Sequence, residues 1–299
     1  MRILITGGAG FIGSHVVEHY QGKADIRVLD NLRTGYRENL DGLDCELVEA
    51  SILDREALAE AMQDVDYVFH LAALISVPES MENPQGCVDL NVTGLLNVLE
   101  TAQRFGVKKV VLASSAAVYG DNPTVPKIET MTPEPRSPYA ITKLDGEYYC
   151  DLYRREGWVN TACLRFFNVF GPRQDPHSAY AAAVPIFIDR ARKNEPITIF
   201  GDGEQTRDFI YVKDIAAGLA FAAETEAVAG ANNIGYGGSI TINQLAEKII
   251  SLTGSQSKIL HAPTRSGDVK HSRASAEKLA ATGWQPLYGF EEGLAQTLR

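Results

Sequence analysis

Cysteine is scarce in this sequence and shows no grouping. The four cysteines, Cys45, Cys87, Cys150 and Cys163, form no C-x-x-C pair and have no histidine partners at the spacing of a zinc site. A disulfide framework and a zinc module are therefore not indicated. We expect reduced, mostly buried thiols and no bound metal.

Positive charge is also limited. Lys and Arg number 28 against 38 Asp and Glu, which gives a net charge of −10 and a pI near 5.1. Binding to nucleic acid or to an anionic membrane would require a basic face, so neither is expected. No apolar run approaches membrane-spanning length, and the first residues lead into an apolar strand rather than a signal peptide. We predict a cytoplasmic protein.

Short apolar runs alternate with longer helical patterns in the first half of the chain. The sequence predicts strands at residues 2–6, 26–30, 45–48, 66–71, 109–114 and 161–166, and helices at residues 11–20, 55–63, 85–105 and 138–156. Asp54 is a plausible N-cap of the second of these helices. Such alternation is typical of α/β proteins with a doubly wound parallel sheet.

The alternation breaks after about residue 167. A helix at 179–193, a strand at 197–200, a loop at 262–268 and helices near 243–253, 274–282 and 290–298 predict a smaller α/β domain. Segments 209–212 and 232–234 are expected to return to the first sheet. We therefore predict a Rossmann-like domain over residues 1–167, rejoined at about 208–235, and a discontinuous substrate-binding domain over 168–299.

A glycine-rich turn follows the first strand. Gly7, Gly10 and Gly13 allow a tight turn and let the backbone approach a pyrophosphate at the positive end of the next helix. Asp30 ends the second strand, where a carboxylate can accept hydrogen bonds from ribose hydroxyls and would repel a 2′-phosphate. This predicts NAD rather than NADP, although Arg33 nearby weakens the preference. The alternatives are a purely structural turn and an Asp30 that merely caps a loop.

Tyr139 and Lys143 lie four residues apart on a predicted helix, so the phenol and the ammonium can converge. A tyrosine with a pKa of about 10 must shift by roughly 3 units to act as a base near neutrality. One cation about 6 Å away supplies about 2.8 kcal/mol at an effective dielectric near 20. Ser115 closes a buried strand and completes a Ser…Tyr-x-x-x-Lys set, which predicts an enzyme that uses a phenolate beside a dinucleotide.

With these residues in view, the chain resembles the extended short-chain dehydrogenase/reductase family and, within it, the UDP-hexose 4-epimerases. The resemblance covers essentially the whole chain and includes the glycine turn, Asp30 with Asn31, residues 70–73, Asn91, residues 114–120, Tyr139 with Lys143, residues 164–168 and residues 207–212. It implies bound NAD, a UDP-sugar substrate, a place in galactose metabolism and a homodimer joined through helices 85–105 and 138–156.

The resemblance also implies the site residues. For the cofactor they are Gly7, Gly10, Phe11, Ile12, Gly13, Asp30, Asn31, Arg33, Thr34, Gly35, Ser51, Ile52, Leu71, Ala72, Ala73, Asn91, Ser114, Tyr139, Lys143 and Phe166. For the substrate they are Ser76, Ser115, Tyr139, Asn168, Tyr180, Phe200, Arg207, Arg265, Asp268 and Ser272.

The same resemblance implies a reaction. Tyr139, as phenolate, takes the proton of the sugar 4-hydroxyl while hydride passes from C4 to the nicotinamide, and Ser115 donates a hydrogen bond to the same oxygen. Lys143 lowers the tyrosine pKa and holds the nicotinamide ribose. The 4-keto sugar turns over and is reduced on its other face, so NAD is regenerated. Arg207 and Arg265 suit contact with the diphosphate.

Specificity and alternatives depend on a few positions. Ser272 matches a gate over the sugar C2 substituent, and its small side chain predicts activity on UDP-GlcNAc and UDP-GalNAc as well as on UDP-Glc and UDP-Gal. Ser51 replaces the usual aspartate of the adenine pocket, which predicts a weaker hold on NAD. Ala116 and Ala117 stand where related dehydratases and decarboxylases carry a carboxylate, which disfavours a lyase. A UDP-glucuronate 4-epimerase, a lyase and a non-catalytic dinucleotide sensor remain alternatives, and His70 is interpreted as structural.

Overall fold

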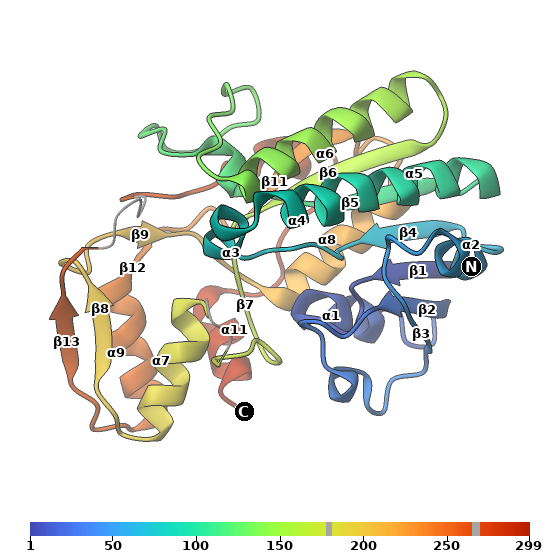
Figure 1. The fold of residues 1–299 in the computed structure, drawn as a ribbon. Coiled ribbons are helices and arrows are strands. Elements are labelled where there is room, and N and C mark those ends of the chain that lie inside the picture. Colours follow the sequence, from blue (N-terminus) through green and yellow to red (C-terminus); the bar gives the residue numbers. More distant parts are fainter. Residues whose placement is uncertain (178–180, 265–269) are drawn as a thin grey trace.

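A seven-stranded sheet, parallel throughout, forms the centre of the molecule (Figure 1). The computed structural model describes residues 1–177, 181–264 and 270–299. Its strands are β1 (Arg2–Thr6), β2 (Asp25–Asp30), β3 (Glu46–Glu49), β4 (Tyr67–His70), β5 (Lys109–Ser115), β6 (Asn160–Phe166) and β11 (Gly230–Ile234). The strand order is β11-β6-β5-β4-β1-β2-β3, so the connections reverse direction at β1. The predicted doubly wound sheet is confirmed.

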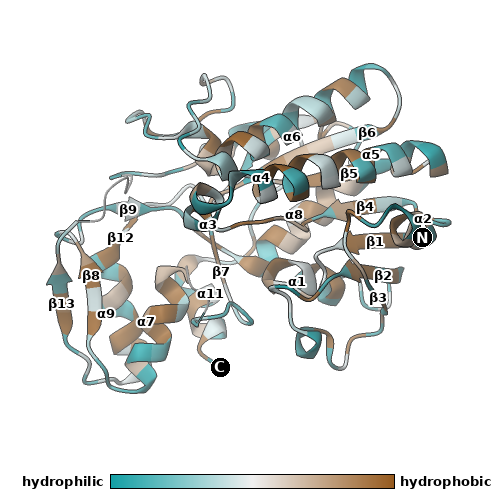
Figure 2. Ribbon diagram, viewed as in Figure 1, coloured by the Kyte–Doolittle hydropathy of each residue, from teal (hydrophilic) through white to brown (hydrophobic). Residues whose placement is uncertain are grey.

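The inner strands are apolar along most of their length because both faces of the sheet are covered. Ile3, Leu4 and Ile5 of β1 have no exposed surface, and Figure 2 shows β1 and β2 in the hydrophobic colours. Helices α1 (Phe11–His19) and α8 (Val212–Glu224) pack on one face. Helices α2 (Arg55–Ala61), α5 (Gly94–Phe105) and α6 (Pro138–Arg155) pack on the other.

Local sequence signals explain several helix ends. The Asp54 carboxylate accepts hydrogen bonds from the main-chain N–H groups of Glu56 and Ala57, both at 3.1 Å, so its predicted role as the N-cap of α2 is confirmed. Helix α3 (Val77–Glu82), which the pattern did not predict, begins with Ser76 as its cap.

The predicted single helix over residues 85–105 is wrong in its middle. The chain forms α4 (Pro84–Val88), a π-helical turn (Asp89–Thr93) and then α5. The wider turn contains Asn91, whose buried side chain bonds to Leu74 and to α6. Turns of this kind often occur at functional sites.

A smaller lobe follows β7 (Asn168–Phe170) and has its own hydrophobic core. It contains α7 (Ala183–Arg192), α9 (Ile242–Thr253), α11 (Phe290–Thr297), β8 (Ile197–Phe200) and β13 (Ile259–Ala262). Strand β13 pairs in parallel with β8 and was not predicted. The helix expected at 179–193 is described from Ala183, and the one expected near 274–282 is only the short α10 (Glu277–Ala280).

The two segments expected to return to the large sheet behave differently. Strand β11 pairs with β6, as predicted for residues 232–234. The prediction for 209–212 is wrong, because β10 (Phe209–Tyr211) pairs with β7 in a separate two-stranded ladder. The position beside β6 is already occupied by β11, so β10 pairs with the extension of β6 instead. None of the helices in the described ranges is long and apolar enough to span a bilayer.

Candidate active site

The predicted cofactor residues gather at the carboxyl edge of the sheet, where α/β proteins bind ligands. Thr6, Asp30, His70 and Ser115 end β1, β2, β4 and β5, and these strands are neighbours in the sheet. The glycine turn leads from β1 into α1 at the point where the strand order reverses. The topology thus places the expected dinucleotide site beside the expected catalytic residues.

The glycine turn has the shape that a diphosphate requires. Gly7 has φ +74°, and a Cβ there would lie 2.7 Å from the main-chain nitrogen of Ala72. A Cβ on Gly13 would lie 2.2 Å from the carbonyl oxygen of Gly7. Helix α1 begins at Gly10 without a side-chain cap and without an acid in its first turn. The N–H groups of this helix end suit an anionic ligand, so the turn fits the diphosphate of a dinucleotide.

The Asp30 carboxylate holds the glycine turn in place by hydrogen bonds. Its two carboxylate oxygens accept hydrogen bonds from Ala9 N at 2.9 Å and Leu32 N at 2.8 Å. Burial raises the pKa of this carboxyl, and the two N–H groups oppose the shift. Each oxygen keeps another lone pair. The side chain therefore holds the loop, as the structural alternative proposed, and can still accept from a ribose.

Ser115, Tyr139 and Lys143 come together as predicted. The Lys143 ammonium lies 5.8 Å from the centroid of the Tyr139 ring and donates to the carbonyl oxygen of Ala113 at 2.8 Å. Interaction with the Ser115 hydroxyl lowers the pKa of the Tyr139 phenol, although burial has the larger effect and raises it. Burial also lowers the pKa of Lys143 to about 8. The expected lowering of the tyrosine pKa by Lys143 is therefore not seen in the protein chain alone.

Ser114 points away from this cluster. Successive residues of a strand face opposite sides, so the Ser114 hydroxyl donates to Glu147 at 2.5 Å while Ser115 faces Tyr139. Glu147 also accepts from Arg165 Nε at 2.9 Å and Nη2 at 2.7 Å, and both side chains are buried. This network holds α6 against β5 and β6.

Sequence reasoning missed Glu147 and Arg165. The available signal was the continued spacing of four residues from Tyr139 through Lys143 to Glu147, which places all three on one face of α6. The partner Arg165 could not be identified from spacing, because it lies on a different element.

Other predicted cofactor residues have defined structural contacts. The Asn91 amide donates to Leu74 O and Thr142 Oγ1, both at 3.0 Å, and accepts from Leu74 N at 2.7 Å, so it fixes the loop after β4. Ser51 accepts from Leu53 N at 3.2 Å, and Ile52 is buried against Gly94.

Two loops lie against the glycine turn. In the loop after β2, which contains Asn31, Arg33 and Thr34, a Cβ on Gly35 would lie 2.9 Å from the main chain of Ala9. Arg33 itself pairs with Glu79. The loop after β4 contains Leu71, Ala72 and Ala73, and the first of these donates from its main chain to Thr6 O at 3.0 Å.

The predicted substrate residues lie on several elements. Ser76 caps α3, accepting from Glu79 N at 3.1 Å, and Asn168 is exposed at the start of β7. Phe200 ends β8 and Arg207 lies on β9 (Thr206–Arg207), beside Ser272, whose N–H donates to Thr206 O at 3.1 Å. The predictions for Tyr180, Arg265 and Asp268 lie outside the described residues.

His70 has the environment of a structural residue. Its Nδ1 lies 2.8 Å from Thr6 Oγ1, and burial lowers its pKa to about 3, which keeps the ring neutral. No cluster of metal-ligating side chains is found in the ranges that the structure describes.

Comparison with known proteins matches most of the chain to one family. The model of the NAD dependent epimerase/dehydratase family matches residues 3–235. A UDP-glucose 4-epimerase from Mycolicibacterium smegmatis is 37% identical over 308 residues, covering 100% of this chain and 97% of that protein. A UDP-N-acetyl-alpha-D-glucosaminuronate decarboxylase from Bacillus cytotoxicus is 35% identical over 316 residues, with coverage of 100% and 97%.

Solved structures are similar over the whole chain. A UDP-N-acetylglucosamine 4-epimerase from Methanobrevibacter ruminantium in complex with UDP-N-acetylmuramic acid has a TM-score of 0.96 and 39% identity, covering 99% of this chain and 96% of that one. A UDP-glucose 4-epimerase from Thermus thermophilus in complex with NAD has a TM-score of 0.92 and 38% identity, covering 100% and 98%.

Proposed function

Because the chain belongs to the NAD dependent epimerase/dehydratase family, we propose that it is an NAD-dependent isomerase that epimerises UDP-hexoses at C4. One observation carries this proposal. Ser115, Tyr139 and Lys143 converge at the carboxyl edge of the sheet beside a glycine turn that fits a dinucleotide diphosphate. Relatives named as UDP-sugar 4-epimerases, at 37% and 39% identity, support the same conclusion.

The chain supplies proton transfer and orientation. Bound NAD supplies a reversible hydride acceptor, which such a reaction requires at C4. Tyr139 removes the proton of the 4-hydroxyl and returns it after the sugar has turned over. Ser115 stabilises the charged phenol oxygen by a hydrogen bond and lowers its pKa. Lys143 is held by Ala113 O at 2.8 Å, which directs its ammonium toward the same site.

We propose that the remaining cofactor and substrate residues act as the resemblance implies. Asn168 and Arg207 hold the diphosphate and Phe200 lies against the uracil, with Arg265, Asp268 and Tyr180 as further candidates. The small Ser272 leaves space for an N-acetyl group, so UDP-GlcNAc and UDP-GalNAc are expected substrates together with UDP-Glc and UDP-Gal.

A lyase reaction is the second candidate because a decarboxylase is 35% identical to this chain. Ala116 and Ala117 follow Ser115 in a short 3₁₀ turn, η3 (Ala116–Tyr119), where a lyase needs an acid or a base. Neither alanine can carry a proton, so epimerisation is favoured. A UDP-glucuronate 4-epimerase differs only in a pocket for the C6 carboxylate.

We also propose a homodimer, formed through α6 and the helices over residues 84–105. Ile141, Tyr148 and Leu152 are 47%, 61% and 44% exposed on one face of α6. Large apolar side chains grouped in this way are typical of an interface.

The same proposal includes a two-domain division at residue 167, a cytoplasmic location and a role in galactose metabolism. The free cysteines support the cytoplasmic location.

The reaction itself can be tested directly. Purified protein is incubated without added cofactor with UDP-Glc, UDP-GlcNAc, UDP-glucuronate and UDP-N-acetylglucosaminuronate, and products are identified by NMR. The expected result is the 4-epimer of the first two sugars without accumulated NADH. Tyr139→Phe should lower kcat by about 10²- to 10⁴-fold, whereas Tyr67→Phe, at the opposite edge of the sheet, should not.

Other products would select other functions. Release of carbon dioxide or a stable 4-keto product would establish a lyase instead. In a parallel incubation with the product sugars, turnover of UDP-galactose with no turnover of UDP-GalNAc would disprove the role of Ser272 as a gate.

A further inference from the structure

Residues 171–177, which we call the strap, follow β7 and lie against α1. Arg173 within the strap has φ +65°, a left-handed conformation that residues with a side chain rarely adopt. Such a conformation persists only where the surrounding contacts hold it. The contacts of Arg173 therefore indicate what the strap is held against.

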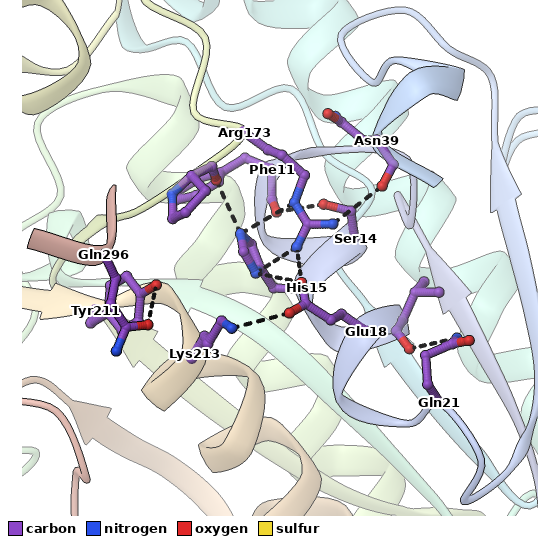
Figure 3. Close-up of polar contacts among 12 residues, drawn as sticks. Phe11, Ser14, His15, Glu18, Gln21, Asn39, Arg173, Tyr211, Lys213 and Gln296 are labelled. Atoms are coloured by element: carbon purple, nitrogen blue, oxygen red, sulfur yellow. Dashed lines mark hydrogen bonds and ion pairs between the residues drawn. The ribbon is translucent and has the colours of Figure 1, made fainter. Parts of the chain in front are cut away.

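Arg173 joins the strap to the first helix (Figure 3). Its guanidinium pairs with Glu18 and lies 2.7 Å from Nδ1 of His15. His15 Nε2 lies 3.0 Å from the carbonyl oxygen of Pro172. These two shorter distances assign the proton to Nε2, which donates to Pro172, and leave Nδ1 to accept from Arg173; the 3.4 Å approach of Arg173 Nε to Nε2 is then a contact without a hydrogen bond. Burial lowers the pKa of His15, which keeps the ring neutral as this arrangement requires.

The same side chain reaches the glycine turn through one intermediate residue. Arg173 Nη1 donates to Asn39 O at 3.3 Å, and the Asn39 amide donates to Ala9 O at 2.8 Å. Ala9 is a residue of the glycine turn, and its N–H donates to Asp30. The strap is thus connected, through Asn39 and Ala9, to the glycine turn and to Asp30, which are the two parts of the expected dinucleotide site.

A second bridge lies beside the first. The Tyr36 hydroxyl donates to Asp175 Oδ2 at 2.8 Å, and the Tyr36 N–H donates to Ala9 O at 3.0 Å. Tyr36 belongs to the loop after β2 that contains Thr34 and Gly35. This bridge is more exposed than the Arg173 cluster, since 48% of Tyr36 is accessible. It is therefore the weaker of the two.

We propose that Arg173 is a positioning residue whose strap slows the release of NAD and keeps Asn168, at the start of the preceding strand β7, aligned with the cofactor. The inference on NAD release rests on the proposed function only in that the protein binds NAD, and the part that concerns Asn168 rests also on the proposed substrate contact of that residue. The strap contacts α1 through Arg173, and the loop after β2 contacts the glycine turn through Tyr36 and Gly35. Parting the strap from α1 removes the contacts of Arg173 with Glu18 and His15 and frees the chain of hydrogen bonds that runs through Asn39 to Ala9.

The test measures how fast bound NAD is lost. Each protein is loaded with NAD, passed through a desalting column, and sampled over time for NAD that remains bound. Arg173→Ala should lose NAD about tenfold faster than wild type, because hydrogen bonds to a charged group are lost. Arg173→Lys should be intermediate, because lysine keeps the charge near Glu18 but lacks the planar fork. Tyr36→Phe should lose NAD about two- to threefold faster, as expected for an exposed hydrogen bond.

Lys213→Ala is the matched control. Lys213 pairs with the other oxygen of Glu18 at 3.1 Å from α8, and the described contacts of its side chain do not include the strap. It should lose NAD at the wild-type rate. The KM for the UDP-sugar should rise in Arg173→Ala and stay unchanged in Lys213→Ala, because only the first variant disturbs the strap, which directly follows β7 and the Asn168 at its start.

The outcomes separate the two proposals. The strap proposal is overturned if a folded Arg173→Ala protein retains NAD as long as the wild type does. It is also overturned if Arg173→Ala and Lys213→Ala lose NAD at equal rates. If Arg173→Ala does not fold, the Tyr36→Phe variant tests the strap proposal instead. Loss of NAD from Tyr36→Phe at the wild-type rate then overturns the proposal. A wild-type protein that keeps NAD but epimerises no sugar contradicts the proposed function and leaves the retention test valid.

Discussion

Burial favours the uncharged forms of both Tyr139 and Lys143. It raises the pKa of the phenol and lowers that of the ammonium to about 8. The reaction needs the opposite pair, a phenolate and a cation. Groups that stabilise charge must therefore oppose burial, and Ser115 is one of them: it lowers the phenol pKa, although its effect is smaller than that of burial.

Replacing Ser115 should shift the pH dependence of the reaction. Ser115→Ala removes an interaction that lowers the phenol pKa, so the pKa rises further and less phenolate is present at any given pH. The acid limb of kcat/KM should move to higher pH, and activity at neutral pH should fall about tenfold or more. The measurement is a pH profile of kcat/KM from pH 6 to 10.

Two variants serve as controls for this profile. Ser115→Thr keeps a hydroxyl and should restore most of the profile. Ser114→Ala should leave the limb in place, because its hydroxyl donates to Glu147 rather than to Tyr139. If the acid limb of kcat/KM does not move in Ser115→Ala, Ser115 does not lower the pKa of the Tyr139 phenol.

At the scale of elements, α6 is held by a buried ion pair one turn beyond its proposed catalytic residues, Tyr139 and Lys143. Arg165 on β6 donates two hydrogen bonds to Glu147, and the side chains are 4% and 6% exposed. Arg165 also donates to the Tyr119 hydroxyl at 2.8 Å, which in turn donates to Asn233 at 2.7 Å. A pair with all its partners satisfied fixes the position of the helix relative to the sheet.

Breaking this pair should destabilise the protein more than breaking a surface pair. Glu147→Gln leaves a buried guanidinium without its carboxylate, which costs about 3–5 kcal/mol in the free energy of unfolding. Glu100→Gln removes an exposed pair with Arg55 and should cost less than about 1 kcal/mol. Urea unfolding of both variants measures the difference.

A further variant distinguishes charge from packing. Adding Arg165→Met to Glu147→Gln should recover part of the lost stability, because the unpaired buried charge is removed. Equal losses in Glu147→Gln and Glu100→Gln would show that the buried pair has no special role.

At the scale of the whole molecule, α6 has two sides with different tasks. Its inner face carries Tyr139, Lys143 and Glu147, while its outer face exposes Ile141, Tyr148 and Leu152. Association through the outer face would make the helix that carries the proposed catalytic residues part of the dimer interface. The position of the active site would then depend on assembly.

Leu152→Arg should disrupt the proposed dimer. Burying an unpaired arginine costs several kcal/mol, so the dimer dissociation constant should rise by about 100-fold or more. Light scattering during size-exclusion chromatography measures the mass in solution. Leu260→Arg is the control, because Leu260 is 50% exposed on β13 in the smaller lobe. A monomeric wild type, or an unchanged dimer in Leu152→Arg, would contradict the interface.

The sequence alone predicted the features that depend on short segments. The glycine turn, the Asp54 cap and the Tyr139–Lys143 spacing are local, because helix and strand periods determine which neighbours share a face. The order of apolar runs was likewise enough to predict the parallel sheet. The functional prediction depended on two of these local motifs, the glycine turn and the Tyr139–Lys143 spacing.

Only the tertiary structure decided the contacts between distant segments. The pairing of Glu147 with Arg165, the contact of Arg173 with α1 and the pairing of β10 with β7 join residues that no local period relates. Burial is also a property of the complete fold, and it set the direction of the Tyr139 and Lys143 pKa shifts. Proximity and desolvation arise when the chain packs, so local patterns cannot specify them.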